Sequence, residues 1–358
     1  GAGACAEAEG TAPTATGGDP VEAAIANLGV PINGCDGANT SGGAGFATST
    51  LTFNLATDPL VLSAPSGIFA ANGAKCTQTV SGVQKQLKTS DVQKIVINGT
   101  AGDDKVILDF LPGSFGTKVL AASGGVVIDL NTTSGGDDSV MLRAGTTADT
   151  YRFAFAASGA NASTTDNVYI EVTNDKVADI DIKPSTSVSG GTLSMTASMG
   201  GGNDTVIANT PAADIDKFSA QTALVVGGLP STLGVTAYGG PGDDKFTGSL
   251  GNDSFFGGDG ADTFKMLATA DGADVYQGDV GSDSIDYSNR TGNLHVDLGP
   301  ATPSVEGGAD LRAPGLYGAS GILNGKTLGA IIDGVRVETT FAAPANPAAV
   351  LTAFNGAA

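Results

Sequence analysis

The chain has 358 residues, of which 37 are acidic and 17 basic, and its formal net charge is −20. This charge argues against nucleic acid and anionic membranes as partners, because both are negatively charged. We also expect no membrane span, since the sequence has no run of about 18 apolar residues. Its 54 glycines, its lack of tryptophan and its many small residues favour short strands joined by tight turns over a helical globule.

Residues 1–18 are rich in glycine, alanine, threonine and proline, which is typical of a disordered arm. We expect such an arm to be ordered by a neighbouring subunit, through strand addition at a sheet edge. A helix pattern then runs from Asp19 to Gly29, with Asp19 as N-cap, Pro20 at the first helical position and Glu22 completing a capping box. This short amphipathic helix is expected to cap an open end of the fold.

The chain has three cysteines. Cys35 and Cys76 could pair across the N-terminal region, which would fit an oxidising compartment. Cys5 is then left over, and it could stay free, pair with one of the other two or link to another chain. The first residue is Gly1 rather than methionine, as we would expect of a mature, processed chain.

Residues 30–98 contain strand-like runs separated by glycine and proline. The alternation of apolar and polar residues predicts strands at Thr48–Leu55, Leu60–Leu62 and Val92–Ile97. Further along, Val119–Leu120, Val126–Leu130 and Ile180–Ile182 are predicted to be inward-facing strands. These segments would form the walls of a coiled, strand-rich fold.

From Asn98 a loose repeat begins, in which glycines precede an aspartate that is followed two residues later by an apolar residue. The matching aspartates are Asp104, Asp138, Asp166, Asp204 and Asp244. Their spacing of about 28 to 40 residues is too long for a two-strand roll and predicts irregular coils of about three strands each. One aspartate column would then run down the molecule, either binding calcium or capping the turns through nearby backbone N–H groups.

Between Gly239 and Asp286 the repeat tightens to a period of nine residues. The blocks GGPGDDKFT, GSLGNDSFF, GGDGADTFK, TADGADVYQ and GDVGSDSID follow the pattern G-G-x-G-x-D-x-U-x, where U is apolar, with an insertion at Met266–Ala268. Glycines allow the sharp turn, and the apolar residue lies on a very short strand. Two blocks make one coil, which places Asp244, Asp262 and Asp283 on one edge and Asp253 and Asp274 on the other.

These blocks resemble the RTX (repeats-in-toxin), or haemolysin-type, calcium-binding proteins of Gram-negative bacteria, and Asp286–Leu298 resembles the strand that closes such a roll. The resemblance covers about 60 of the 358 residues. It implies Ca2+ bound between stacked turns, by carboxylates and backbone carbonyls that supply its oxygen ligands. The expected calcium ligands are Asp244, Asp253, Asp262, Asp274 and Asp283 in the roll, Asp243 beside them, and Asp104, Asp138 and Asp204 in the looser turns.

Residues 299–343 lose the repeat. Ala330–Glu338 is predicted to contain a hairpin with its turn at Asp333–Gly334. A second cap helix is predicted near the end of the chain, with Asn346 as its N-cap and Gly356 as its stop.

Catalysis is not expected. The single histidine, His295, has no G-x-S-x-G or H-E-x-x-H motif to accompany it, and there is no cluster of cysteine and histidine. The nearest thing to a basic cluster, Lys85, Lys88 and Lys94, is interpreted as a solvated face. A polysaccharide-modifying enzyme on a β-helix stays as an alternative, because acidic residues abound and fold does not imply function.

The sequence therefore predicts an all-β protein: a right-handed parallel β-helix with large coils that continues into an RTX-like calcium β-roll, with short helical caps at the ends. Its segments are expected to be a low-complexity arm (1–18), an N-terminal cap with the first strands (19–98), the large-coil β-helix (99–238), the calcium roll (239–298) and a C-terminal cap (299–358). We expect a secreted, calcium-binding structural protein of a bacterial surface that self-assembles into a filament, sheath or S-layer, with an adhesin that binds surface glycans as an alternative.

Overall fold

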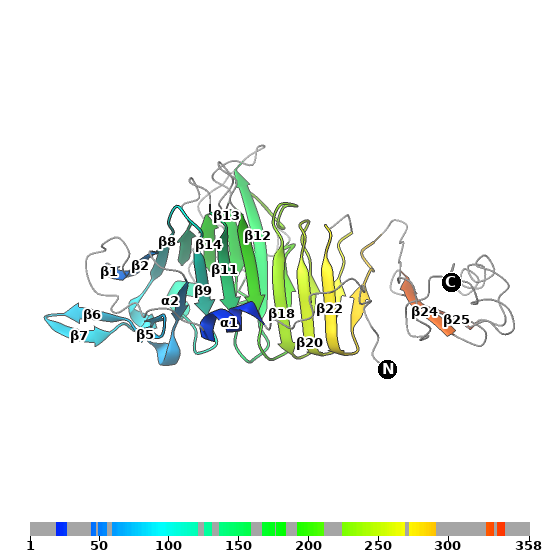
Figure 1. Cartoon of the computed structure of the whole chain (residues 1–358), viewed down its shortest axis with the longest axis horizontal. Helices are drawn as coiled ribbons and strands as arrows, with labels where there is room; N and C mark the ends of the chain where they lie inside the picture. The colour runs from blue at the N-terminus through cyan, green and yellow to red at the C-terminus, as the bar shows by residue number, and fades with distance from the viewer. Residues whose placement is uncertain are drawn as a thin grey trace.

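The computed structural model describes residues 19–26, 44–47, 49–55, 59–120, 125–130, 136–158, 167–175, 177–183, 192–210, 224–268, 272–290, 327–332 and 335–340. Strands dominate this part of the chain, and most of them belong to two sheets. The strands stand side by side along the long axis of the molecule (Figure 1). In the described residues no helix is long and apolar enough to cross a membrane.

The first sheet, called sheet A, has twelve strands, most of which pair in parallel. In spatial order they are β1 (Ala44–Ala47), β2 (Thr50–Asn54), β8 (Lys94–Asn98), β10 (Val126–Asp129), β14 (Ile180–Lys183), β13 (Asn167–Glu171), β12 (Thr150–Ser158), β16 (Thr205–Ile207), β19 (Lys245–Thr247), β21 (Thr263–Lys265) and β23 (Ser284–Asp286), with β17 (Leu224–Gly227) pairing with β12 off this path.

The second sheet, called sheet B, has nine strands. In spatial order they are β22 (Val275–Gly281), β20 (Ser254–Gly260), β18 (Val235–Pro241), β15 (Leu193–Ser198), β11 (Asp138–Arg143), β9 (Lys105–Asp109), β3 (Leu60–Ser63), β4 (Ala70–Ala71) and β5 (Ala74–Lys75). The remaining elements are α1 (Pro20–Ala26), α2 (Thr117–Leu120), the 3-10 turns η1 (Pro65–Gly67) and η2 (Thr89–Asp91), and two hairpins, β6–β7 (Thr77–Val80, Val83–Gln86) and β24–β25 (Thr327–Ile332, Val335–Thr340).

From β8 to β23 the chain winds back and forth between the two sheets, except that β12, β13 and β14 follow one another within sheet A, as do β16 and β17. This confirms the predicted all-β, parallel β-helix or roll. The prediction of about three strands per coil is wrong. Spacing misled it because the extra residues lie in connections and in two added strands of sheet A. β13 pairs antiparallel with β12 and β14, and β17 pairs antiparallel with β12, so neither builds a third wall.

The core lies between the sheets, because the inward residues of both walls belong to one buried cluster. In the large coils these residues are mainly aliphatic, such as Ile95 and Val126, which pair in register on β8 and β10. In the tight roll they are aromatic: Phe246 stacks on Phe255 and Phe264 with ring centroids 5.2 and 5.3 Å apart. A buried aromatic side chain typically stabilises a fold by about 1.5–3 kcal/mol, so the short strands β19 and β21 are anchored by one ring each.

Helix α1 forms where the sequence predicts a helix, with the Asp19 carboxylate accepting a hydrogen bond of 2.8 Å from the Val21 N–H. Its predicted position at an open end is wrong. Val21 packs on the outer face of sheet B, against Val61, Ile107 and Met141. The reason is that these strands are apolar on both faces, and the outer face needs its own cover. Figure 1 shows α1 lying across this sheet beside β11.

Other local predictions have mixed outcomes. The predicted strands at Thr48–Leu55, Leu60–Leu62 and Val92–Ile97 correspond to β2, β3 and β8. Val119–Leu120, predicted as a strand, instead ends the short helix α2, because both side chains reach the core from one helical turn.

The predicted hairpin at Ala330–Glu338 is present as β24 and β25, whose pairing joins Ile332 with Val335. The second cap helix at Asn346–Gly356 lies outside the described residues. Cys76 is buried and disulfide-bonded. Because Cys5 and Cys35 lie outside the described residues, pairing of Cys35 with Cys76 stays a prediction.

Candidate metal centre

One column of aspartates runs along the edge at which the strands of sheet A begin. Its members are Asp149, Asp204, Asp244, Asp262 and Asp283, each immediately before a strand. Each backbone N–H donates to Oδ1 of the next aspartate in the column, at 2.7, 2.7, 2.8 and 3.0 Å in order. These hydrogen bonds, called rungs below, connect successive coils because each joins a backbone N–H of one turn to a side chain of the next.

A second set of aspartates lies where the strands of sheet B begin. Asp104 donates its N–H to Oδ1 of Asp138 at 3.0 Å, and Asp253 donates to Oδ1 of Asp274 at 2.9 Å. Consecutive strands of a coil run in opposite directions, so this set lies on the opposite edge from the first column. The placement of Asp244, Asp262 and Asp283 on one edge, with Asp253 and Asp274 on the other, is therefore as the nine-residue period predicts.

The single column predicted through the looser turns is wrong. Asp104 and Asp138 precede or begin strands of sheet B, whereas Asp204 and Asp244 precede strands of sheet A. Coil length alone does not reveal which wall a turn leads into. Asp166, also predicted in that column, lies outside the described residues.

Sequence reasoning missed two features of the turns. Asp149 belongs to the first column, and the apolar Tyr151 two residues later was the signal. In addition, the residue before each aspartate forms its own rungs: Asp243 N–H donates to Oδ1 of Asn203 at 3.1 Å, and Ala261 N–H donates to Oδ1 of Asp243 at 2.8 Å. The recurring pairs Asn-Asp and Asp-Asp were the signal for this second ladder.

Glycines let successive turns stack in direct backbone contact. A Cβ on Gly240 would overlap the carbonyl oxygen of Gly200, and one on Gly258 would overlap that of Gly240. Gly240 and Gly258 also have φ of 99° and 107°, in the region that favours glycine. Only glycine therefore fits, and the turns present a stack of carbonyl groups beside the aspartates.

Three carboxylates of the first column are buried with one oxygen left unbonded. These oxygens are Oδ2 of Asp204, Asp244 and Asp262. Burial raises the pKa of all three side chains, to about 6 for Asp204, about 7 for Asp244 and about 6 for Asp262. For Asp244 the neighbouring carboxylates of Asp204 and Asp262 raise the pKa further. A cation at this column would remove both penalties.

These residues fit Ca2+, a hard cation that takes six to eight oxygen ligands. Asp204, Asp244 and Asp262 would contribute carboxylate oxygens there. In the described residues no group of three acidic, histidine or cysteine side chains is gathered to hold a metal. The remaining donors would therefore be the stacked backbone carbonyls, which neutralise no charge but complete the coordination.

On the opposite edge three carboxylates accept hydrogen bonds from nearby protein donors through Oδ2. Asp253 Oδ2 accepts 2.6 Å and 3.0 Å bonds from the Ser249 N–H and hydroxyl, and Asp104 Oδ2 accepts a 2.7 Å bond from Thr100 N–H. Asp274 accepts a 2.7 Å bond from the Tyr276 hydroxyl. Asp104, Asp253 and Asp274 thus differ chemically from Asp204, Asp244 and Asp262, whose Oδ2 atoms have no such donors.

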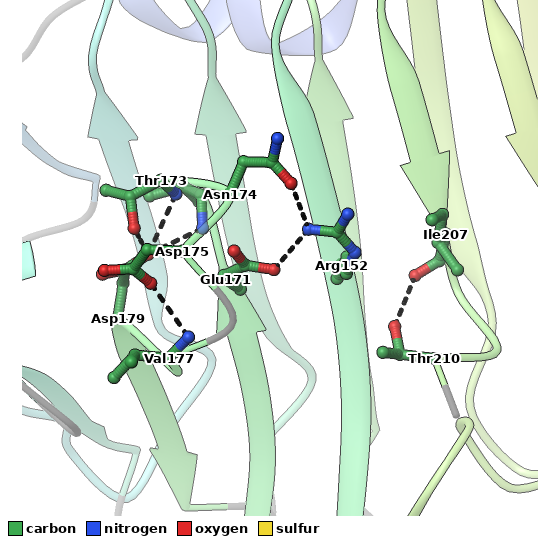
Figure 2. Close-up of polar contacts among 10 residues, drawn as sticks. Arg152, Glu171, Thr173, Asn174, Asp175, Val177, Asp179, Ile207 and Thr210 are labelled. Atoms are coloured by element: carbon green, nitrogen blue, oxygen red, sulfur yellow. Dashed lines mark hydrogen bonds and ion pairs between the residues drawn. The ribbon is translucent and has the colours of Figure 1, made fainter. Parts of the chain in front are cut away.

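A further polar cluster lies on the added strands of sheet A. Asp179, before β14, accepts three bonds through Oδ2 from the Val172 N–H and from the N–H and hydroxyl of Thr173. Burial raises the pKa of Asp179 to about 7. Figure 2 shows this turn beside Arg152, whose guanidinium lies 2.6 Å from the buried Glu171. These bonds hold the connection between β13 and β14 in place.

The described residues of this site include neither the single histidine nor the lysine cluster. His295 lies outside the described residues. Lys85, Lys88 and Lys94 are exposed, as expected of a solvated face.

Comparison with known proteins identifies the repeat. The family model of the RTX calcium-binding nonapeptide repeat matches residues 236–264, with 4 copies. The match covers the turns that carry Asp244, Asp253 and Asp262, and it stops short of those that carry Asp204, Asp274 and Asp283. A search of curated proteins finds no match to the chain, and neither does a search of solved structures.

Proposed function

Starting from the RTX calcium-binding nonapeptide repeats at residues 236–264, we propose that this is a secreted structural protein whose β-roll is held in its folded state by calcium. The repeats make the chain a calcium-binding protein of a kind that is typically secreted. The finer proposal concerns where calcium acts and what the folded protein is for.

The observation that carries the calcium sites is the set of buried, unbonded Oδ2 atoms of Asp204, Asp244 and Asp262. A buried carboxylate without a partner costs free energy, and stacked carboxylates repel one another. Calcium between the turns offsets both costs. Asp204 extends the column one coil beyond the matched repeats, because it has the same buried oxygen and the same rung to Asp244 at 2.7 Å.

Calcium then acts by mass action on folding. A ligand that binds only the folded state stabilises it by about 2.7 kcal/mol per site when its free concentration is 100 times the dissociation constant. Extracellular calcium modules often bind at roughly 10⁻⁴ to 10⁻³ M. The roll would therefore stay loose at low intracellular calcium and fold outside the cell.

The test is a calcium titration of the chelated full-length protein, followed by circular dichroism and calorimetry. We expect strand signal and melting temperature to rise with calcium, and Asp244→Asn to weaken the response. Asp259→Asn is the matched control, since its exposed side chain lies in a neighbouring turn and removes the same charge. A melting temperature that does not respond to calcium would overturn the proposal.

We further propose that the folded protein self-assembles on a bacterial surface. In the described residues the last strands, β22 and β23, pair on one side only. Val275 and Val280 on β22 are 46% and 68% exposed, which is unusual for valine on a strand. A second copy could cover this edge, with the arm 1–18 as an alternative contact.

Negative-stain imaging tests assembly. Regular polymers in millimolar calcium that dissolve on chelation would support it, and deletion of residues 1–18 would show whether the arm is needed. Discrete monomers in both conditions would contradict it.

An adhesin is the second candidate, and one surface feature favours it. Tyr238 and Phe256 stack at 4.8 Å on the outer face of sheet B, half-buried. They line a cavity of about 300 Å³ that also includes Asp19 and Asp279. Aromatic rings beside carboxylates suit sugar rings with their hydroxyl groups. A glycan array comparing the wild type with Tyr238→Ala tests this candidate; equal binding by both would remove it.

A further inference from the structure

We infer that the second and fourth residues of each turn decide whether its aspartate binds calcium or is capped by the protein itself, and that Ser249 and Thr100 thereby exclude calcium from their own turns. The turn residues are counted here so that the aspartate is the sixth. This inference rests on the calcium sites proposed above and concerns which turns of the repeat carry them.

Four turns have a positive φ at both positions. Their second and fourth residues are Gly200 and Gly202 (83° and 131°), Gly240 and Gly242 (99° and 149°), Gly258 and Gly260 (107° and 142°), and Asp279 and Gly281 (63° and 158°). In the first three of these turns the aspartate keeps a buried Oδ2 atom without a hydrogen bond, whereas Asp283, the aspartate of the fourth, is partly exposed. The backbone N–H of the second residue does not reach the carboxylate.

Three other turns have a second residue without a positive φ, and in each its N–H donates to Oδ2 of the aspartate. The donors are Thr100 to Asp104 at 2.7 Å, Gly145 to Asp149 at 3.0 Å and Ser249 to Asp253 at 2.6 Å. Among the described turns that can be compared in this way, the second residue caps the aspartate in the three turns without a positive φ there and in none of the four with it.

The backbone explains the division. A Cβ disfavours positive φ, least for Asp and Asn, and Asp279 is the one second residue with a Cβ that has a positive φ in the described turns. Ser249 and Thr100 keep the ordinary conformation, and their N–H groups point at the carboxylate. The turn of Asp149 shows that the fourth residue matters as well. There the second residue is Gly145, but the fourth is Thr147, which again lacks a positive φ.

The hydroxyl group adds to this capping. The Ser249 hydroxyl donates to Asp253 at 3.0 Å and accepts from Gly251 N–H at 3.0 Å. The Thr100 hydroxyl does the same, at 3.1 Å to Asp104 and 3.2 Å from Gly102 N–H. The carboxylate is thereby satisfied by donors of its own turn.

The consequence is an asymmetric roll. Calcium binds along the edge of Asp204, Asp244 and Asp262, and the turn of Asp253 on the opposite edge needs none. In sequence the two turns differ at the second residue, where GSLGND has serine and GGPGDD has glycine.

The experiment is calcium stoichiometry of the full-length protein by equilibrium dialysis with atomic emission, together with melting temperature with and without calcium. The variants are Ser249→Gly, the conservative Ser249→Thr, and Ser231→Gly as a control in an exposed turn. We expect Ser249→Gly to bind a further calcium ion and to melt more calcium-dependently, while the other two match the wild type. Unchanged stoichiometry in folded Ser249→Gly would overturn the inference.

Two asparagine variants keep the test decisive if Ser249→Gly fails to fold. We expect Asp253→Asn to retain the wild-type number of calcium ions and Asp244→Asn to lose calcium. An equal loss in both would also overturn the inference. A wild-type protein that binds no calcium would instead refute the proposed function, so the two failures can be told apart.

Discussion

The large coils and the tight roll share two walls and one core, but they reach stability in different ways. In the large coils, strands of four to six residues such as β10 and β11 carry several buried aliphatic side chains each. In the tight roll, β19 and β21 have three residues and one buried ring each. The roll is short only in sheet A, since β20 and β22 in sheet B have seven residues each. We expect calcium in the turns to compensate for the short strands of sheet A.

Calcium removal should have the largest effect, because it should destabilise the tight roll much more than the large coils. We expect hydrogen exchange of β19–β23 to become fast after chelation, while β8–β11 stay protected by their own core. The physical reason is that the buried, unbonded carboxylate oxygens of Asp204, Asp244 and Asp262 lie before the three-residue strands β16, β19 and β21. Mass spectrometry of peptides from the two regions measures this, and equal loss of protection in both would show that they unfold as one unit.

Truncating a buried ring in the roll is expected to have the second largest effect on the free energy of unfolding. Phe246→Ala removes a fully buried ring that stacks on Phe255 and Phe264. Such a change typically costs about 3–5 kcal/mol. Chemical denaturation in calcium measures it, with Ile128→Val in the large coils as a milder reference of about 0.5–1.5 kcal/mol. A loss for Phe246→Ala below that of the reference would contradict the anchoring role of the rings.

The pH dependence of folding stability should have opposite signs in the calcium-free and the calcium-loaded protein. Burial raises the pKa of Asp204 to about 6 and of Asp244 to about 7, above the value of roughly 3.9 in an unfolded chain. Without calcium the folded state therefore binds more protons across this window, and its stability falls as pH rises from roughly 4 to 7. With calcium, which binds the ionised form, the apparent affinity rises over the same range. Denaturation midpoints at several pH values test both signs.

The smallest effect is expected at the ion pair between α1 and sheet B. Arg143 forms two 2.6 Å bonds with the half-exposed Glu22, and it also lies 3.6 Å from Asp109. Because such a partly solvated pair is usually worth about 1 kcal/mol or less, Glu22→Gln should lower the melting temperature only slightly, and equally with or without calcium. A calcium-dependent change would show that α1 is coupled to the roll.

The sequence predicts the tight roll better than the large coils, for physical reasons. A nine-residue block can form only one turn and one short strand. The edge of the roll on which each aspartate from Asp244 to Asp283 lies therefore follows from its position in the series of blocks. In the large coils, insertions such as β13 and β14 change the length of a coil without changing its walls, and counting then fails for Asp104 and Asp138. The different bonding of Asp253 and Asp244 was also hidden, since it depends on the sign of φ at Ser249 and Gly240.

The hydrogen bonds of the first aspartate column make the turns a linear array in which each turn is coupled only to its neighbours. Each turn holds the next through an N–H bond from one aspartate to the following carboxylate. In such a linear array, a defect at an end only shortens the ordered run, whereas a defect in the middle divides it into two runs that must each survive alone. Loss of Asp244 should therefore be felt on both sides of its coil, and loss of Asp283 on one side only.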